Sequence, residues 1–76
     1  MTTVAAIDVG TNSTNLLVID DQGTEITRVI TSTRLGEGLQ STGELSIEAT
    51  TRTIDVIASY VTTAQSLGVT KIHIVG

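Results

Sequence analysis

The sequence predicts an α/β fold whose elements follow the order β-β-β-α-β. Two short apolar runs near the start, Val4–Asp8 and Thr14–Asp20, are typical of strands. After Ser46 the apolar residues recur with the period of a helix, and Thr70–Val75 is again typical of a strand. Because a helix separates this last strand from the others, we expect it to run parallel to one of them, within a mixed sheet.

The first three strands are expected to form an antiparallel meander. The stretch Asp-Gln-Gly at residues 21–23 is a turn signal of the hairpin kind and separates the second strand from the third. The third strand contains Ile26, Val29 and Ile30, and their imperfect alternation predicts a β-bulge near Arg28–Val29.

A loop and a long helix follow the meander. The segment from Arg34 to Gly43 contains three glycines and is predicted to be a loop. Ser46 is a suitable helix N-cap, Gly68 stands where a C′ glycine ends a helix, and Glu48 is expected to pair with Arg52 one turn along. The predicted apolar stripe of this helix, about twenty residues long, comprises Ile47, Ile54, Ile57, Ala58, Val61, Ala64 and Leu67.

The composition is that of a small acidic chain with a thin core. The 76 residues include no cysteine, Tyr60 is the only aromatic residue, and the net charge is −4. Short chains without disulfides or bulky core residues are marginally stable by themselves. We therefore expect residues 1–76 to be the N-terminal part of a larger domain.

Charge and hydropathy patterns argue against nucleic-acid and membrane partners. The basic residues are scattered along the chain, which is unlike a nucleic-acid groove. No apolar run approaches the length that spans a bilayer. The N-terminus lacks the basic start of a secretion signal, and Asp8 interrupts any apolar leader, so the expected location is the cytoplasm.

The stretch Asp-Val-Gly-Thr-Asn-Ser between the first two predicted strands indicates a phosphate site. The bend at Gly10 lets backbone amides approach an anion, while Thr11, Asn12 and Ser13 add side-chain donors. A carboxylate repels a bare phosphate, so the natural partner of Asp8 is a hydrated divalent cation such as Mg2+. The alternative interpretation is an ordinary hairpin turn, with the aspartate capping it.

Two further residues are candidates for a role at a site. Arg34 opens the glycine-rich loop, and a guanidinium can grip two phosphate oxygens at once; a solvated loop charge is the alternative. His73 is the only histidine, and no second ligand lies at a metal-binding spacing from it. We therefore interpret His73 as structural.

Three segments, in order, resemble the family of exopolyphosphatases and guanosine pentaphosphate phosphohydrolases, the Ppx/GppA family. Residues 6–13 followed by Leu-Leu-Val at 16–18 resemble its first phosphate motif. Residues 33–39 resemble its Arg-Leu-Gly-x-Gly-Leu loop, and residues 72–76 resemble the strand that leads to its next phosphate-contacting turn. Together the three segments span nearly the whole chain.

The resemblance implies a fold and a reaction. The fold is the ribonuclease H-like fold of actin, sugar kinases and Hsp70-type ATPases, of which β-β-β-α-β is the opening portion. The reaction is metal-dependent release of terminal orthophosphate from inorganic polyphosphate. In the family, a glutamate beyond these residues is thought to activate water, so neither Glu37 nor any other residue here is assigned as catalytic. A second phosphate motif and subdomain are also expected elsewhere, so residues 1–76 alone should be inactive.

Other functions stay open on the sequence alone. Hydrolysis of guanosine pentaphosphate uses the same motifs. An ATP-dependent kinase or chaperone of the same fold is a second class, although residues 10–13 and the Arg34–Leu39 loop argue against it. A non-catalytic sensor of phosphorylated alarmones is a third. The oligomeric state is open as well, with a homodimer of the full-length protein as one alternative.

Overall fold

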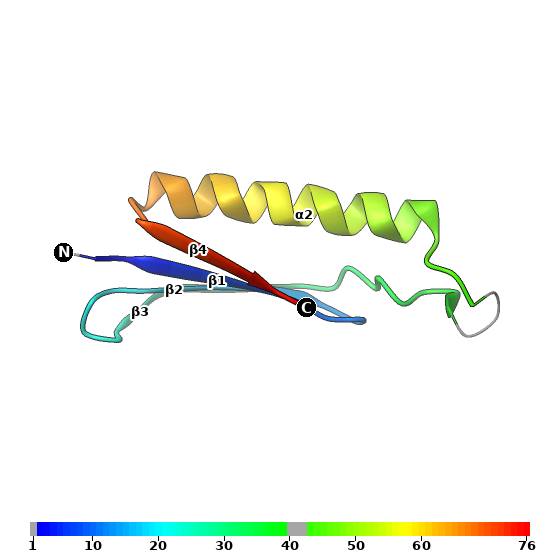
Figure 1. The fold of residues 1–76 in the computed structure, drawn as a ribbon, viewed down its shortest axis with the longest axis horizontal. Coiled ribbons are helices and arrows are strands. Elements are labelled where there is room, and N and C mark those ends of the chain that lie inside the picture. The colour runs from blue at the N-terminus through cyan, green and yellow to red at the C-terminus, as the bar shows by residue number, and fades with distance from the viewer. Residues whose placement is uncertain (1, 40–42) are drawn as a thin grey trace.

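The computed structural model describes residues 2–39 and 43–76 and confirms the predicted order of elements. Helix α2 lies along one face of a mixed sheet (Figure 1). Residues 40–42, within the predicted loop, lie outside the described residues. The elements are β1 (Val4–Val9), β2 (Thr14–Ile19), β3 (Glu25–Thr31), α2 (Ile47–Ser66) and β4 (Lys71–Val75).

The strands lie side by side in the order β3-β2-β1-β4. The first three pair antiparallel, as predicted for a meander, and β4 pairs parallel to β1. The helix therefore carries the chain from one edge of the sheet to the other. As a result, β1 lies between two partners, with its C-terminal end beside that of β4.

The β-bulge lies closer to the hairpin turn than predicted. Pairing between β2 and β3 shifts between Val18 and Ile19, so that Ile26 is the extra residue, whereas Arg28–Val29 pair regularly. Next to this shift the side chain of Asp20 accepts two amide hydrogen bonds of 2.9 Å within the turn. The Asp20 side chain fixes the geometry of the turn, so the extra residue, Ile26, is accommodated in the strand just after it.

The core lies between α2 and the two central strands. Ala5 and Ile7 of β1 and Leu16 and Val18 of β2 are fully buried, and they alternate with residues on the other face of the sheet. Tyr60 and Ala64 contribute from the helix. The opposite face of the sheet carries no helix in the described part of the chain (Figure 1).

The buried face of α2 differs from the predicted stripe. Ile57, Val61 and Ala64 pack at the core as expected, but Ile47 and Ile54 are 85% and 58% exposed. Ala58 and Leu67 are also exposed. The residues of α2 that are buried are Ala49, Thr53, Tyr60 and Ala64. The small side chains of Ala49 and Ala64 let the helix approach the sheet closely. Thr53 can be buried because its hydroxyl donates to the carbonyl oxygen of Ala49 in the same helix. The positions of the apolar residues alone therefore do not identify the buried face.

Both ends of α2 have the predicted caps. The Ala49 N–H donates to Ser46 Oγ at 3.0 Å. At the other end Gly68 has a φ of 76° and donates to Gln65 O, while the Val69 N–H donates to Ala64 O. This pair of bonds is a Schellman motif, which needs a left-handed residue at C′. Neither α2 nor any other helix of the described residues is long and apolar enough to cross a membrane.

Tyr60 connects the helix to the meander through hydrogen bonds as well as packing. Its hydroxyl donates to the carbonyl oxygen of Thr14 at 2.8 Å, and Thr31 Oγ1 lies 2.5 Å from the same hydroxyl. Only 5% of Tyr60 is exposed, so these polar groups meet away from water. The hydroxyl thus adds a buried hydrogen bond between the helix and the first residue of β2.

Replacing Tyr60 by Phe tests this connection. We expect Tyr60→Phe to lower the free energy of unfolding by about 1–2 kcal/mol, because it removes the buried hydrogen bonds of the hydroxyl with Thr14 and Thr31. Urea unfolding followed by circular dichroism measures the change. Ser59→Ala, at an exposed position of the same helix, is the control and should leave the midpoint unchanged. An unaltered midpoint for Tyr60→Phe would contradict the assignment.

Candidate phosphate-binding site

The turn between β1 and β2 is closed by its first and last residues. The Gly10 N–H donates to Ser13 O at 2.9 Å, and a Cβ on Gly10 would lie 3.1 Å from that oxygen. A larger residue would push against the carbonyl, so glycine allows the closure. The N–H of Gly10 is therefore used within the turn and is not available to an anion.

The next three residues present donors that the described residues leave unused. The backbone N–H groups of Thr11, Asn12 and Ser13 donate to no backbone acceptor in this part of the chain. The side chains of Thr11 and Asn12 are exposed, and that of Ser13 is half-buried. Successive unpaired amides in a bend form the kind of concave donor group that binds anions.

The glycine-rich loop docks directly onto this turn. The Arg34 N–H donates to Asn12 O at 3.0 Å, and the Gly36 N–H donates to Thr11 O at 2.9 Å. A Cβ on Gly36 would lie 3.3 Å from the Cβ of Thr11, so the close approach favours glycine. The structure thus brings together two segments that the sequence analysis proposed separately for phosphate binding.

A buried pair of hydroxyls supports the junction from behind. Thr14 Oγ1 and Thr33 Oγ1 lie 2.9 Å apart, and both residues are fully buried. Thr14 directly follows the turn, and Thr33 directly precedes Arg34. Because each hydroxyl satisfies the other, the pair holds the two segments together without an unpaired polar group in the interior.

Arg34 combines an unusual backbone with an exposed side chain. Its φ of 50° lies in the left-handed region, which few non-glycine residues adopt. Its side chain is 61% exposed, and its Nε lies 4.0 Å from Glu37 Oε2. The backbone of Arg34 is therefore bonded to the turn, and its guanidinium is exposed to solvent, although it has an acidic neighbour.

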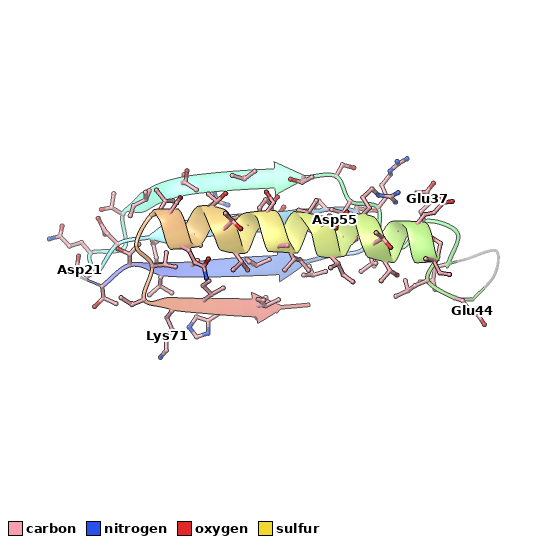
Figure 2. The ribbon with its side chains drawn as sticks, turned by 90° about the horizontal axis from the view of Figure 1, so that it is seen from above. Asp21, Glu37, Glu44, Asp55 and Lys71 are labelled. Atoms are coloured by element: carbon pink, nitrogen blue, oxygen red, sulfur yellow. The ribbon has the colours of Figure 1, made fainter. Side chains whose placement is uncertain are left out.

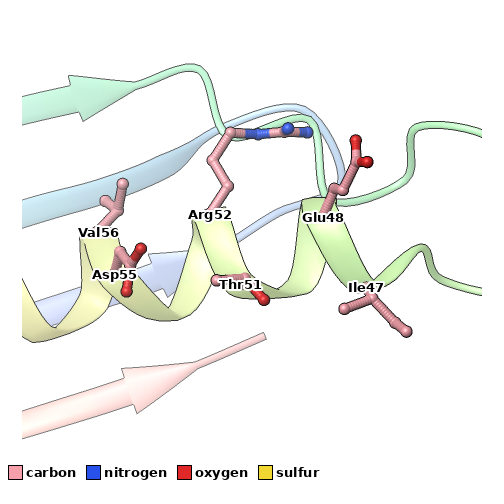
Figure 3. Close-up of a pocket in the computed structure, with 6 residues that line it drawn as sticks. All are labelled: Ile47, Glu48, Thr51, Arg52, Asp55 and Val56. Atoms are coloured by element: carbon pink, nitrogen blue, oxygen red, sulfur yellow. The ribbon is translucent and has the colours of Figure 1, made fainter.

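Arg52 contributes to this region, and its ion-pair partner differs from the predicted one. Instead of the expected Glu48, its ion-pair partner is Glu37, with Nη2 2.8 Å from Oε2. Its Nε also donates to Thr33 O at 2.6 Å. Figure 3 shows the Arg52 side chain extending from α2 towards the loop. The predicted Glu48–Arg52 pair follows from the i,i+4 spacing on one helix. No local pattern in the sequence indicates that Arg52 contacts the loop instead.

Asp8 lies at the C-terminal end of β1 and is exposed. The Asp8 side chain makes no hydrogen bond among the described residues, so it does not cap the β1–β2 turn. The aspartate that caps a turn is Asp20, in the next hairpin. The partner of Asp8 across the sheet is Asn15, on the same face, whose Oδ1 is buried and unpartnered. Asn15 was not among the predicted site residues. The pairing register of β1 and β2 identifies it as a candidate, because it places Asn15 opposite Asp8.

These two oxygen donors fit a hydrated cation better than an all-protein metal cage. No cluster of three or more histidine, cysteine, aspartate or glutamate residues occurs in the ranges 2–39 and 43–76. Mg2+ commonly uses one or two carboxylates, with water and substrate phosphate completing its shell. Asp8 and Asn15 are the residues here that could supply two oxygen ligands to such an ion. His73 is exposed on β4 opposite Ala6, away from the helix face.

An open groove of about 590 Å³ runs beside the first turns of α2 (Figure 3). Two of its residues, Glu48 and Asp55, are acidic and would repel a polyanion. The β1–β2 turn is the better candidate site, since the backbone N–H groups of residues 11–13 have no backbone acceptor among the described residues. The residues that line the groove are Ile47, Glu48, Thr51, Arg52, Asp55 and Val56.

The fold defines a protein of the α/β class with the opening portion of the ribonuclease H-like, actin-type fold, as expected. A model of the Ppx/GppA phosphatase family matches residues 16–76. Because this match covers most of the chain, the chain belongs to the Ppx/GppA phosphatase family. No match was found among curated protein sequences.

Solved structures of this family superpose closely on the chain. One Ppx/GppA phosphatase from Aquifex aeolicus, in its type II variant, matches with a TM-score of 0.92 and 26% identity over 97% of this chain and 26% of its own. A second Aquifex aeolicus structure has a TM-score of 0.82 and 30% identity, covering 96% and 25%. An exopolyphosphatase from Cytophaga hutchinsonii has a TM-score of 0.88 and 24% identity, covering 96% and 24%. The chain therefore spans about a quarter of their length.

Replacing Gly36 by Ala tests the docking of the loop on the turn. The added Cβ crowds Thr11 and weakens the docking of the loop on the turn. We therefore expect the amide hydrogens of residues 34 and 36 to exchange roughly five- to tenfold faster than in the unmodified protein. Hydrogen exchange measured by NMR reports each amide. Gly23→Ala is the control, because an added Cβ there meets open space in the distant hairpin; although the φ of 78° strains an alanine locally, the amides of residues 34 and 36 should exchange as in the unmodified protein. Equal exchange rates in Gly36→Ala and the unmodified protein would contradict this contact.

Proposed function

We propose that this chain is the phosphate-holding part of a metal-dependent hydrolase that releases terminal orthophosphate from inorganic polyphosphate. The observation that carries the proposal is the group of three consecutive unpaired amides at residues 11–13, with Arg34 docked beside them. Such a group favours the oxygens of a phosphoryl end over other ligands. Membership of a phosphatase family supports the same conclusion.

The groups that surround the β1–β2 turn match the phosphate part of a substrate. The donors near the turn are amides, hydroxyls and a guanidinium, which are all suited to phosphate oxygens. A substrate that consists only of phosphate is matched by this set of groups.

The chain's own residues act by binding and orienting the substrate. The amides of residues 11–13 and the hydroxyls of Thr11 and Ser13 donate to oxygens of the terminal phosphoryl group. Arg34 grips two further oxygens with its planar guanidinium. Fixed in this way, the phosphorus is presented to an attacking water from a constant direction, which lowers the entropic part of the barrier.

Asp8 and Asn15 would hold the divalent cation. When bound, the cation reduces the negative charge of the phosphoryl group and so favours attack by water. The two residues contribute orientation, since they lie opposite one another on adjacent strands at the end that leads into the turn. No residue of this chain is assigned to activating the water, and that group would belong to another part of the full-length protein.

Substitution of Asp8 tests the cation site. In the full-length protein we expect Asp8→Asn to lower kcat for phosphate release by at least about 100-fold, because the cation loses its charged ligand. Release of orthophosphate from polyphosphate, measured over a series of Mg2+ concentrations, should also show a higher requirement for Mg2+. Asp21→Asn is the control, because Asp21 lies at the opposite end of the molecule from the loop residue Glu37 (Figure 2). Unchanged turnover in Asp8→Asn would remove Asp8 from the mechanism.

Substitution of Arg34 tests substrate binding and the choice of substrate. We expect Arg34→Ala to raise the KM for polyphosphate about tenfold or more, because a bidentate phosphate contact is lost. Arg28→Ala, which removes another exposed arginine on the face of the sheet away from α2, should leave the KM unchanged. The full-length protein is assayed in parallel with guanosine pentaphosphate. A higher kcat/KM for that nucleotide than for polyphosphate would overturn the proposed substrate.

A further inference from the structure

Arg52 makes three contacts with the loop that carries Arg34. Its Nε donates to Thr33 O at 2.6 Å, and its Nη2 lies 3.3 Å from Arg34 O and 2.8 Å from Glu37 Oε2. The Arg52 side chain is 31% exposed, so it is more enclosed than the other charged groups around it. One guanidinium from the helix therefore binds two carbonyls and one carboxylate of the loop.

Glu37 lies between two arginines that compete for its carboxylate. The same atom, Oε2, is 2.8 Å from Arg52 Nη2 and 4.0 Å from Arg34 Nε. A carboxylate that is hydrogen-bonded to one guanidinium attracts a second one less strongly. The pairing with Arg52 thus limits how tightly Glu37 holds Arg34.

We propose that Arg52 is a positioning residue that keeps the Arg34 guanidinium available for phosphate. It does so by occupying the Glu37 carboxylate, and its hydrogen bonds to the carbonyls of Thr33 and Arg34 hold the Arg52 guanidinium in place for this pairing. This inference rests on the proposed function of Arg34 as a phosphate ligand. Arg52 itself does not contact the substrate in this scheme.

The proposal makes a specific statement about what happens when Arg52 is removed. Glu37 then loses its partner at 2.8 Å, and the nearest remaining cation is Arg34 at 4.0 Å. The Glu37 carboxylate pairs with Arg34, so substrate phosphate has to displace it. Because this competition concerns binding and not the attack of water, it raises KM and leaves kcat nearly unchanged.

The first test measures the kinetics of the full-length protein with polyphosphate. We expect Arg52→Ala to raise KM about tenfold, with kcat within about twofold of the unmodified protein. Arg28→Ala is the matched control, because Arg28 also forms a 2.8 Å ion pair, with Glu25. It should leave KM unchanged. An unaltered KM in Arg52→Ala, or a loss confined to kcat, would overturn the proposal.

The second test separates positioning from a general contribution to stability. Adding Glu37→Gln to Arg52→Ala removes the charge that captures Arg34, and we expect KM to return to within about threefold of its original value. Loss of packing or of the carbonyl contacts would not be repaired by that change. A double variant with the same high KM as Arg52→Ala would therefore overturn the proposal.

The folding of each variant is checked by circular dichroism. If Arg52→Ala does not fold, Arg52→Gln takes its place, since it retains donors for the carbonyls but no charge for Glu37, and the same rise in KM and rescue are expected. The two proposals fail differently. An unmodified protein that releases no phosphate from polyphosphate contradicts the proposed function, whereas an active one whose KM is insensitive to Arg52 contradicts only this inference.

Discussion

Two backbone hydrogen bonds between the glycine-rich loop and the β1–β2 turn underlie the whole candidate site. They run from the N–H groups of Arg34 and Gly36 to the carbonyl oxygens of Asn12 and Thr11. Carbonyl oxygens repel anions, and here two of them are already occupied by donors from the loop. The turn consequently presents mainly N–H and hydroxyl groups, so its proposed role in binding anions depends on a segment distant in the sequence.

Helix α2 determines where these two segments lie relative to one another. Tyr60 binds the carbonyl of Thr14, directly after the turn, and Arg52 binds the carbonyl of Thr33, directly before the loop. Between them lies the buried pair of threonine hydroxyls. The same helix supplies Tyr60 and Ala64 to the hydrophobic core, so one element contributes to both the packing and the site geometry. A shift of the helix would move both halves of the site together.

Features that depend on neighbouring residues were predictable from the sequence, and features that depend on the pairing of distant segments were not. The caps at Ser46 and Gly68 and the parallel last strand are confirmed, because each follows from a short pattern or a connection rule. The bulge and the buried face of the helix were misplaced, since strand register and close helix approach decide them. The roles of Arg52 and Asn15 were missed for the same reason. The meeting of turn and loop was suggested only by resemblance to a family.

The position of Tyr60 gives the protein an internal optical reporter. The chain contains no tryptophan or phenylalanine, so its near-ultraviolet absorption and emission come from this single phenol. The phenol hydroxyl is hydrogen-bonded to the first residue of the strand that leaves the turn. Tyrosine emission is sensitive to hydrogen bonding of the hydroxyl. Movements of that strand would therefore change the tyrosine emission of residues 1–76 without labelling, since no other aromatic residue lies in this stretch.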